Sequence, residues 1–129
     1  MNQEKQFEMS LVKELKKRGV FAHHFDAVGC DGWPDVLALK NNECLLIECK
    51  YHTLDLRDEQ YAFHALLKAK YGFNRIFSCS RMEQGYIVKD TCFPDYEHHY
   101  ANIYELSDMI NKELGDDRIP DEAGGKGKQ

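Results

Sequence analysis

Three charged residues of this 129-residue chain have the types and the spacing of a hydrolytic site. Glu48 and Lys50 lie two positions apart at the end of an apolar run, and Asp35 closes an upstream turn that reads Gly-Trp-Pro-Asp. Because side chains alternate along an extended strand, Glu48 and Lys50 should emerge on the same face. A tight turn at residues 40–43 would fold the chain back as a hairpin and bring Asp35 to them.

Two carboxylates beside one ammonium suit the metal-assisted hydrolysis of a phosphodiester. Mg2+ takes oxygen ligands, usually one or two carboxylates with water and substrate phosphate oxygens. We therefore expect Asp35 and Glu48 to bind Mg2+, for which Mn2+ can substitute, and Lys50 to orient the attacking water. The alternative is that Glu48 and Lys50 form a surface ion pair worth roughly 0–1 kcal/mol. The apolar strand and the Pro-Asp turn favour catalysis.

At these residues the chain resembles the PD-(D/E)XK nuclease superfamily, and within it the archaeal-type Holliday junction resolvases and the VRR-NUC domains. The resemblance extends over residues 8–80. Gly32-x-Pro34-Asp35 is similar to the motif that supplies the first strand carboxylate, and Ile47-Glu48-Cys49-Lys50 is similar to the E-x-K motif. The resemblance implies a restriction-endonuclease-like core, and it implies that the main-chain carbonyl of Cys49 also binds the metal.

Two further residues take roles from this resemblance. Glu8, in Glu8-x-x-Leu11-Val12-x-x-Leu15, is similar to the glutamate of the resolvases' opening helix, which joins the metal site. Gln60, in Leu56-x-x-x-Gln60, is similar to the VRR-NUC glutamine that approaches the site from the following helix. The apolar spacing by itself predicts a helix over residues 3–17 with Glu8 at the edge of its apolar stripe. From there Glu8 can reach a site or simply pair with a lysine on the helix surface.

The rest of the chain predicts an α/β domain with a mixed central β-sheet flanked by helices. We expect strands over residues 20–25, 75–80 and 85–88, a helix over 56–71 that Asp55 caps and Gly72 ends, and a short helix near 107–114. Residues 91–106 show no clear periodicity. A single nuclease domain should span residues 1–114, and the glycine- and lysine-containing residues 115–129 are predicted to be a disordered tail.

Charge is distributed unevenly along the chain. Residues 1–94 carry 13 basic and 13 acidic side chains, whereas residues 95–129 carry 4 basic and 9 acidic ones. Basic residues on the first helix can neutralise DNA phosphates, although solvated faces would look the same. Beside the site, the ring of Trp33 can stack on a base or cap the hairpin, and His52, at the next same-face position after Lys50, can assist at the phosphate. The candidates for nucleic-acid binding are Lys13, Lys16, Lys17, Trp33 and His52.

Other histidines and the five cysteines carry weaker signals. His23 and His24 should point to opposite faces of a strand, so only one of them can face the site. The cysteines are odd in number and contain no C-x-x-C pair, which argues against a disulfide framework or a zinc site. No apolar stretch approaches a membrane span and no signal peptide is evident, so we expect an intracellular protein without a membrane partner.

These observations predict a Mg2+- or Mn2+-dependent endodeoxyribonuclease. The resemblance implies branched DNA, such as a four-way junction, as the substrate, and a homodimer, because symmetric cutting of a junction needs two active sites. One alternative is a flap, single-strand or fork nuclease of the same superfamily. Another is a non-catalytic nucleic-acid-binding or assembly module that keeps the fold, to which the acidic C-terminal part lends support.

Overall fold

A computed structural model describes residues 2–25, 33–73, 75–91 and 93–115 of the chain. The connection over residues 26–32, Cys30, Cys92 and most of the predicted tail lie outside the described residues. Three helices and six strands follow one another along the described chain. In order they are α1 (Gln3–Lys17), β1 (Phe21–His24), β2 (Val36–Lys40), β3 (Glu43–Tyr51), α2 (Asp58–Tyr71), β4 (Ile76–Met82), β5 (Gly85–Asp90), β6 (Phe93–Tyr100) and α3 (Ile103–Glu113).

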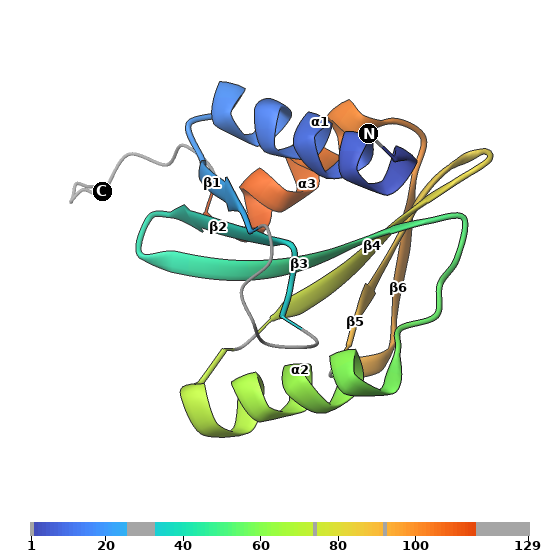
Figure 1. Cartoon of the computed structure of the whole chain (residues 1–129). Coiled ribbons are helices and arrows are strands. Elements are labelled where there is room, and N and C mark those ends of the chain that lie inside the picture. The colour runs from blue at the N-terminus through green and yellow to red at the C-terminus, as the bar shows by residue number, and fades with distance from the viewer. Residues whose placement is uncertain (1, 26–32, 74, 92, 116–129) are drawn as a thin grey trace.

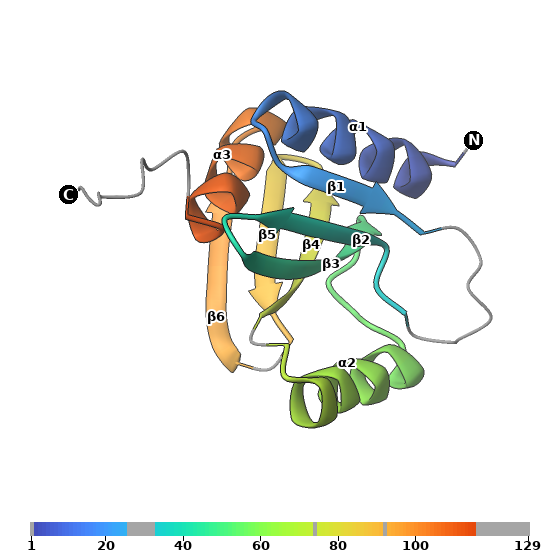
Figure 2. The same ribbon diagram turned by 90° about the vertical axis from the view of Figure 1, so that its left-hand side faces the viewer.

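The strands form one mixed sheet in the order β1-β2-β3-β4-β5-β6. Within the described part of the chain, β3 and β4 are the only neighbours that run parallel, because α2 forms a crossover connection between them, and the other neighbours are antiparallel. Helices α1 and α3 cover one face, and α2 covers the other (Figure 1). The view in Figure 2 shows the same separation of the helices. The predicted fold class, a mixed sheet flanked by helices, is confirmed.

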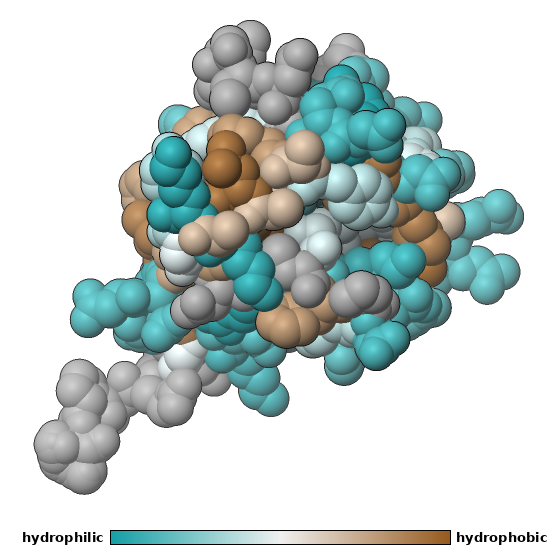
Figure 3. All heavy atoms as spheres, turned by 90° about the horizontal axis from the view of Figure 1, so that it is seen from below, coloured by the Kyte–Doolittle hydropathy of each residue, from teal (hydrophilic) through white to brown (hydrophobic). Residues whose placement is uncertain are grey.

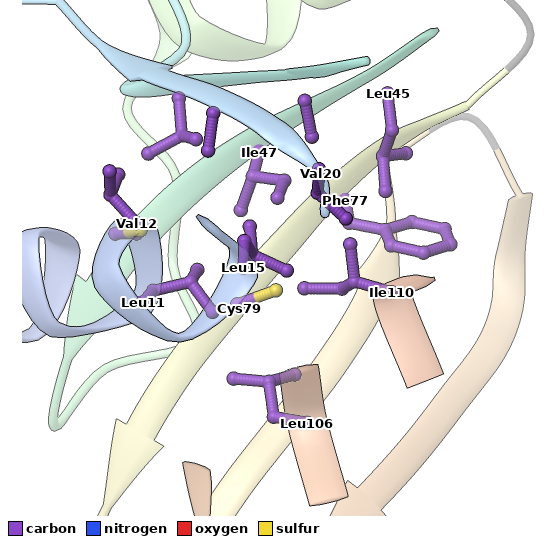
Figure 4. Close-up of a cluster of buried hydrophobic side chains, with 14 of the residues drawn as sticks. Leu11, Val12, Leu15, Val20, Leu45, Ile47, Phe77, Cys79, Leu106 and Ile110 are labelled. Carbon is purple, nitrogen blue, oxygen red and sulfur yellow. The ribbon is translucent and has the colours of Figure 1, made fainter. Parts of the chain in front are cut away.

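The main core lies between the sheet and helices α1 and α3. Cys49 and Cys79, paired in register on β3 and β4, point into it, and both are free thiols, as is Cys44. Figure 4 shows the apolar side chains that α1, α3, β3 and β4 contribute to this layer. They include Leu11, Leu15, Ile47, Phe77, Leu106 and Ile110, each at most 1% exposed. Because Ile47 and Cys49 face this core, Glu48 and Lys50 face α2.

The hairpin that positions Asp35 forms as predicted. Asn41 and Asn42 link β2 to β3 with φ values of 55° and 65°. Two consecutive positive φ values are typical of the turn that best matches the twist of a two-residue hairpin, and asparagine tolerates them. The resulting register pairs Val36 with Ile47. Asp35, one residue before β2, therefore lies next to the Glu48 segment of β3.

Several expectations from the sequence are wrong in detail. Helix α2 begins at Asp58 with Arg57 as its N-cap residue, so Asp55 does not cap it. Residues 93–100, which show no clear periodicity in the sequence, form the edge strand β6, and α3 begins at Ile103 rather than near 107. His52 does not continue the face of Lys50, because β3 ends at Tyr51 and His52 has a φ of 59°.

Candidate active site

Asp35, Glu48 and Lys50 come together as their spacing predicts. The Asp35 N–H donates to the carbonyl of Ile47 at 3.0 Å, which ties the turn to β3. The Asp35 Oδ2 accepts from the backbone N–H of Cys49 at 2.7 Å. The Asp35 and Glu48 side chains also share a hydrogen bond. The two carboxyl groups are therefore in direct contact.

Burial changes the acid–base properties of this pair. Glu48 is only 2% exposed. Loss of solvation raises the pKa of Asp35 to about 7, and the nearby Glu48 carboxyl adds to the effect. Loss of solvation also raises the pKa of Glu48 to about 7, and the positive charge of Lys50 opposes the shift at both groups. Two interacting acids of this kind titrate as a pair, which shares a proton near neutral pH.

Gln60 joins the lysine to the glutamate, as its resemblance-based role implies. Its Oε1 accepts from Lys50 Nζ at 2.9 Å, and its Nε2 donates to Glu48 Oε2 at 3.1 Å. The same Oε1 accepts the backbone N–H of Arg57 at 2.8 Å, at the start of α2. One amide therefore fixes the ammonium, one carboxylate oxygen and the helix N-terminus together.

His64, which was not among the predicted site residues, lies against the other oxygen of Glu48. It lies one turn after Gln60 on α2, its Nε2 is 3.3 Å from Glu48 Oε1, and its Nδ1 is 3.2 Å from Thr91 Oγ1. Burial lowers the pKa of His64 to about 4, so the ring is neutral near pH 7. A neutral ring with its hydrogen on Nε2 can donate to the carboxylate. The four-residue spacing from Gln60 is the signal that could have revealed it.

Glu8 is buried on α1 at the border of this site. Its Oε1 is 3.3 Å from Lys5 Nζ and 3.5 Å from His24 Nδ1. Burial raises the pKa of Glu8, and the negative charge of Asp35 raises it further. Of the two adjacent histidines, His24 is thus the one that faces the site. Glu8 therefore pairs with a lysine, which is one of the two roles weighed from the sequence, and its charge also interacts with that of Asp35.

Glu4 is a second acidic residue of α1 near the site, and it was not among the predicted site residues. Burial raises its pKa, and its charge interacts with Lys50 and Asp35. Its side chain accepts a hydrogen bond from the backbone N–H of Tyr51 at the end of β3. Glu4 precedes Glu8 by four residues, so the two lie on one side of the helix. That spacing was the available signal.

The donor chemistry of the site fits a hard divalent cation. Asp35 and Glu48 offer carboxylate oxygens, and their raised pKa values show that neighbouring cationic groups do not compensate both charges. A cation between them would remove this deficit. Among the described residues, however, no three His, Cys, Asp or Glu side chains already form a cluster that could hold a metal. The resemblance implies that Glu8 joins the metal site. In the structure, however, Glu8 does not already form a three-carboxylate cluster with Asp35 and Glu48.

The residues considered for DNA binding lie in different environments. Lys13, Lys16 and Lys17 line a groove of about 560 Å3 together with Met9, Val12 and His24. His52 is exposed and stacks on Tyr51 with ring centroids 4.2 Å apart. Trp33 packs against Phe25 and Phe63, at 5.3 and 5.4 Å between centroids, so its ring contributes to a small second core beneath α2.

The fold and the E-x-K residues resemble those of the PD-(D/E)XK nucleases. The family model "Archaeal holliday junction resolvase (hjc)" matches residues 2–61. Among solved structures, the chain is similar to Hjc of Archaeoglobus fulgidus, described as a Holliday junction resolvase from an archaeal hyperthermophile. That similarity has a TM-score of 0.59 and 18% identity, and covers 81% of this chain and 98% of that chain. No curated protein matches the chain.

These findings confirm the resemblance to the archaeal Holliday junction resolvases, in sequence over residues 2–61 and in fold over most of the chain. The resolvases of this family are nucleases that act on branched DNA, so the sequence-based prediction of such a nuclease is confirmed at the level of the family. Among the described residues, no helix has both the length and the apolar character that a membrane crossing needs.

Proposed function

We propose that this protein is an endodeoxyribonuclease that uses Mg2+ or Mn2+ to cleave branched DNA. The observation that carries the proposal is the Asp35–Glu48 carboxyl pair beside Lys50, with Gln60 hydrogen-bonded to both Lys50 and Glu48. A purely structural ion pair would need only one of the two carboxylates. The family match supports the choice of branched DNA.

In this proposal Asp35 and Glu48 hold the metal, together with the main-chain carbonyl of Cys49. Glu8 contributes through charge or through a shared water. When bound, the metal lowers the pKa of its water and neutralises charge that develops at the phosphorus. Lys50 places its ammonium beside the attacking water and stabilises the transition state.

Gln60 keeps the ammonium of Lys50 and the carboxylate of Glu48 at a fixed separation. The neutral ring of His64 holds the second carboxylate oxygen, so the plane of the carboxylate is set from both sides. Such outer contacts commonly tune metal affinity about 10- to 100-fold.

The groove lined by Lys13, Lys16 and Lys17 is the proposed path of the DNA backbone. His24 lines this groove and also contacts Glu8, so the groove leads to the site. Lys17 is partly neutralised by Glu14, 3.1 Å away, which makes Lys13 and Lys16 the stronger phosphate contacts. Symmetric cutting of a four-way junction would require two copies of the chain, and we propose a homodimer on that ground.

A panel of labelled DNA structures tests this function. Four-way junction, three-way junction, flap, fork, single strand and linear duplex would be incubated with the protein in Mg2+, Mn2+ and EDTA. Metal-dependent paired cuts in the four-way junction support the proposal. Preferential cutting of the flap, fork or single strand would favour the corresponding nuclease of the same superfamily. Binding without cleavage of any structure would indicate a non-catalytic module.

A further inference from the structure

A small pocket lies next to the candidate active site on the face that α2 covers. Its volume is about 170 Å3, below the range of about 300–1,000 Å3 that is usual for drug-sized ligands. The segment before α2, the first turn of α2, and strands β4 and β5 supply its walls. A single ring-sized group fits this volume, and a larger ligand does not.

The pocket is connected to the carboxyl pair by two short paths. Ser78, in its wall, is the register partner of Glu48 on the neighbouring strand. Thr91, also in its wall, contacts His64, and His64 contacts Glu48. A group bound in the pocket would therefore lie close to a phosphate held at Glu48.

Ser78 provides the sign that the pocket receives a polar ligand. This residue is 3% exposed, and its Oγ has no hydrogen-bond partner among the described residues. A buried hydroxyl without a partner carries an energetic penalty, and native proteins usually satisfy such groups. A ligand that offers a donor or an acceptor at this point would remove the penalty.

The chemistry of the walls selects a nucleobase over a phosphate. Leu54 and Leu56 form an apolar wall suited to the flat face of a heterocycle, and the ring of Tyr61, 49% exposed, can stack on it. The hydroxyl of Ser78 can hydrogen-bond a base edge, and the acidic side chain of Asp90 in the lining disfavours a phosphate. Lys89, also in the lining, can meet the adjoining backbone phosphate.

We infer that this pocket takes one unpaired nucleobase of the DNA while the neighbouring phosphodiester lies at the carboxyl pair. A base inside a duplex is stacked and cannot enter such a pocket without the cost of unpairing, which is least at a strand end or an unpaired position. At a fork or flap such bases are already unpaired, and at a four-way junction the base pairs that border the branch point open at the least cost. The pocket thereby adds a structural reason for branch selectivity, and this inference rests on the proposed nuclease function. Figure 3 views the molecule from the side of α2, where hydrophobic residues lie exposed among hydrophilic ones.

An abasic scan tests the inference. A fork with an unpaired arm is prepared with one base removed at successive positions near the branch point, and its affinity is measured by fluorescence anisotropy in Ca2+. Loss of the base at one position should weaken binding of the parent protein roughly 5- to 100-fold, as expected for one stacked base. Tyr61→Ala should weaken binding of the intact fork and should abolish the sensitivity to that one position.

Tyr71→Ala is the matched control. Tyr71 is an aromatic residue at the other end of α2, 62% exposed and absent from the pocket lining. The Tyr71→Ala variant should lose as much DNA affinity as the parent when the base at the sensitive position is removed. Because Tyr61 is half exposed, its replacement should not prevent folding, and circular dichroism would verify this for both variants.

The outcomes separate this inference from the function on which it rests. If the parent cleaves branched DNA but no abasic position weakens its binding, the base pocket is refuted and the nuclease stands. The same holds if Tyr61→Ala and Tyr71→Ala respond alike to the scan. If the parent neither binds nor cleaves any of the DNA structures, both proposals are refuted.

Discussion

The half-buried Asp35 and the buried Glu48 form a carboxyl pair whose side chains share a hydrogen bond, and loss of solvation raises the pKa of each group to about 7. Their contact joins the turn before β2 to the middle of β3, so the hairpin itself brings the two acids together. Such a pair stores repulsion in the metal-free protein once both groups are ionised. Metal binding, stability and cleavage should therefore all respond to changes in this pair and in the groups around it.

Asp35→Asn should leave the metal-free protein as stable as the parent, or more stable. The amide removes one of two like charges, and its oxygen can still accept from the Cys49 N–H, as Asp35 Oδ2 does at 2.7 Å. Mn2+ at about 10- to 100-fold above its Kd should stabilise the parent by roughly 1–3 kcal/mol, and the variant should lose most of that gain. Thermal melts in EDTA and in Mn2+ measure both effects.

Asp55→Asn is the control for this comparison, since Asp55 is an exposed carboxylate outside the site. It should respond to Mn2+ like the parent. If Asp35→Asn is destabilised in EDTA while the parent is insensitive to metal, Asp35 is a structural turn residue and the metal site is elsewhere.

The metal-free protein should lose stability from the carboxyl pair as the pH rises from about 4 to about 7. Folded Asp35 has its pKa raised from 3.8 to about 7, and Glu48 has its pKa raised from 4.5 to about 7. In that interval the folded state binds more protons than the unfolded state, so the slope of unfolding free energy against pH is negative. The contribution is fully present below pH 4 and is lost above the folded pKa.

His64 contributes the opposite slope, because its pKa is lowered from 6.5 to about 4 and stability from this group rises over that interval. The contribution of His64 cancels in the difference in unfolding free energy between the parent and Asp35→Asn, so this difference reports on the carboxyl pair. Urea titrations at pH 4.5 to 8 measure the free energy of unfolding of both proteins. The value for Asp35→Asn minus that for the parent should increase with pH by up to roughly 1.4 kcal/mol per pH unit. A constant difference across this range would contradict the raised pKa of the pair.

The local sequence was sufficient to predict the elements that carry the acids. The apolar stripe of α1, the hairpin of β2 and β3, and the alternation of Glu48 and Lys50 are short-range patterns with one physical interpretation. The structure gives α1 the predicted bounds, Gln3–Lys17. The convergence of Asp35 with Glu48 followed from the turn alone.

Features that depend on distant parts of the chain were not predictable in this way. Strand β6 lies at the edge of the sheet and leaves Asp95, Glu97, His98 and His99 exposed, so it lacks the alternation that marks a strand. His64 and Glu4 become part of the site only through the packing of α2 and α1 around β3. Their roles depend on tertiary contacts at 3.3 Å or on charge, whereas their four-residue spacings from Gln60 and Glu8 indicate only a shared side of a helix.

Gln60→Leu should weaken metal binding about 10- to 100-fold while the fold is kept. The leucine fills a similar volume but removes the donor to Glu48 Oε2 and the acceptor for Lys50 Nζ, so both charged groups lose their alignment. Isothermal titration with Mn2+ measures the affinity. Gln6→Leu, an exposed glutamine of α1, is the control and should bind the metal like the parent. Equal affinity in Gln60→Leu would show that the amide is not needed at the site.

Lys13→Ala combined with Lys16→Ala should weaken binding to all DNA sequences alike. If both ammonium groups neutralise phosphates of duplex DNA, the slope of log affinity against log salt should become less negative by about 0.9 for each lysine removed. Lys70→Ala on α2 is a control outside the groove. An unchanged slope in the double variant would place the DNA on another surface.

Lys50→Ala should abolish cleavage and preserve metal binding, because the lysine acts on the nucleophile and not on the cation. Lys50 is 8% exposed, and its Nζ donates to Gln60 Oε1 at 2.9 Å. That oxygen keeps the Arg57 N–H as a donor at 2.8 Å, so the variant leaves no acceptor unpaired and should fold.

Lys50→Arg should also cleave poorly, since a planar guanidinium does not replace a compact ammonium. Cleavage of a four-way junction and Mn2+ titration at pH 8, where the carboxyl pair is ionised, measure the two properties on the same samples. Parent-like cleavage by Lys50→Ala would exclude the lysine from the reaction, and loss of both properties would assign it to metal binding.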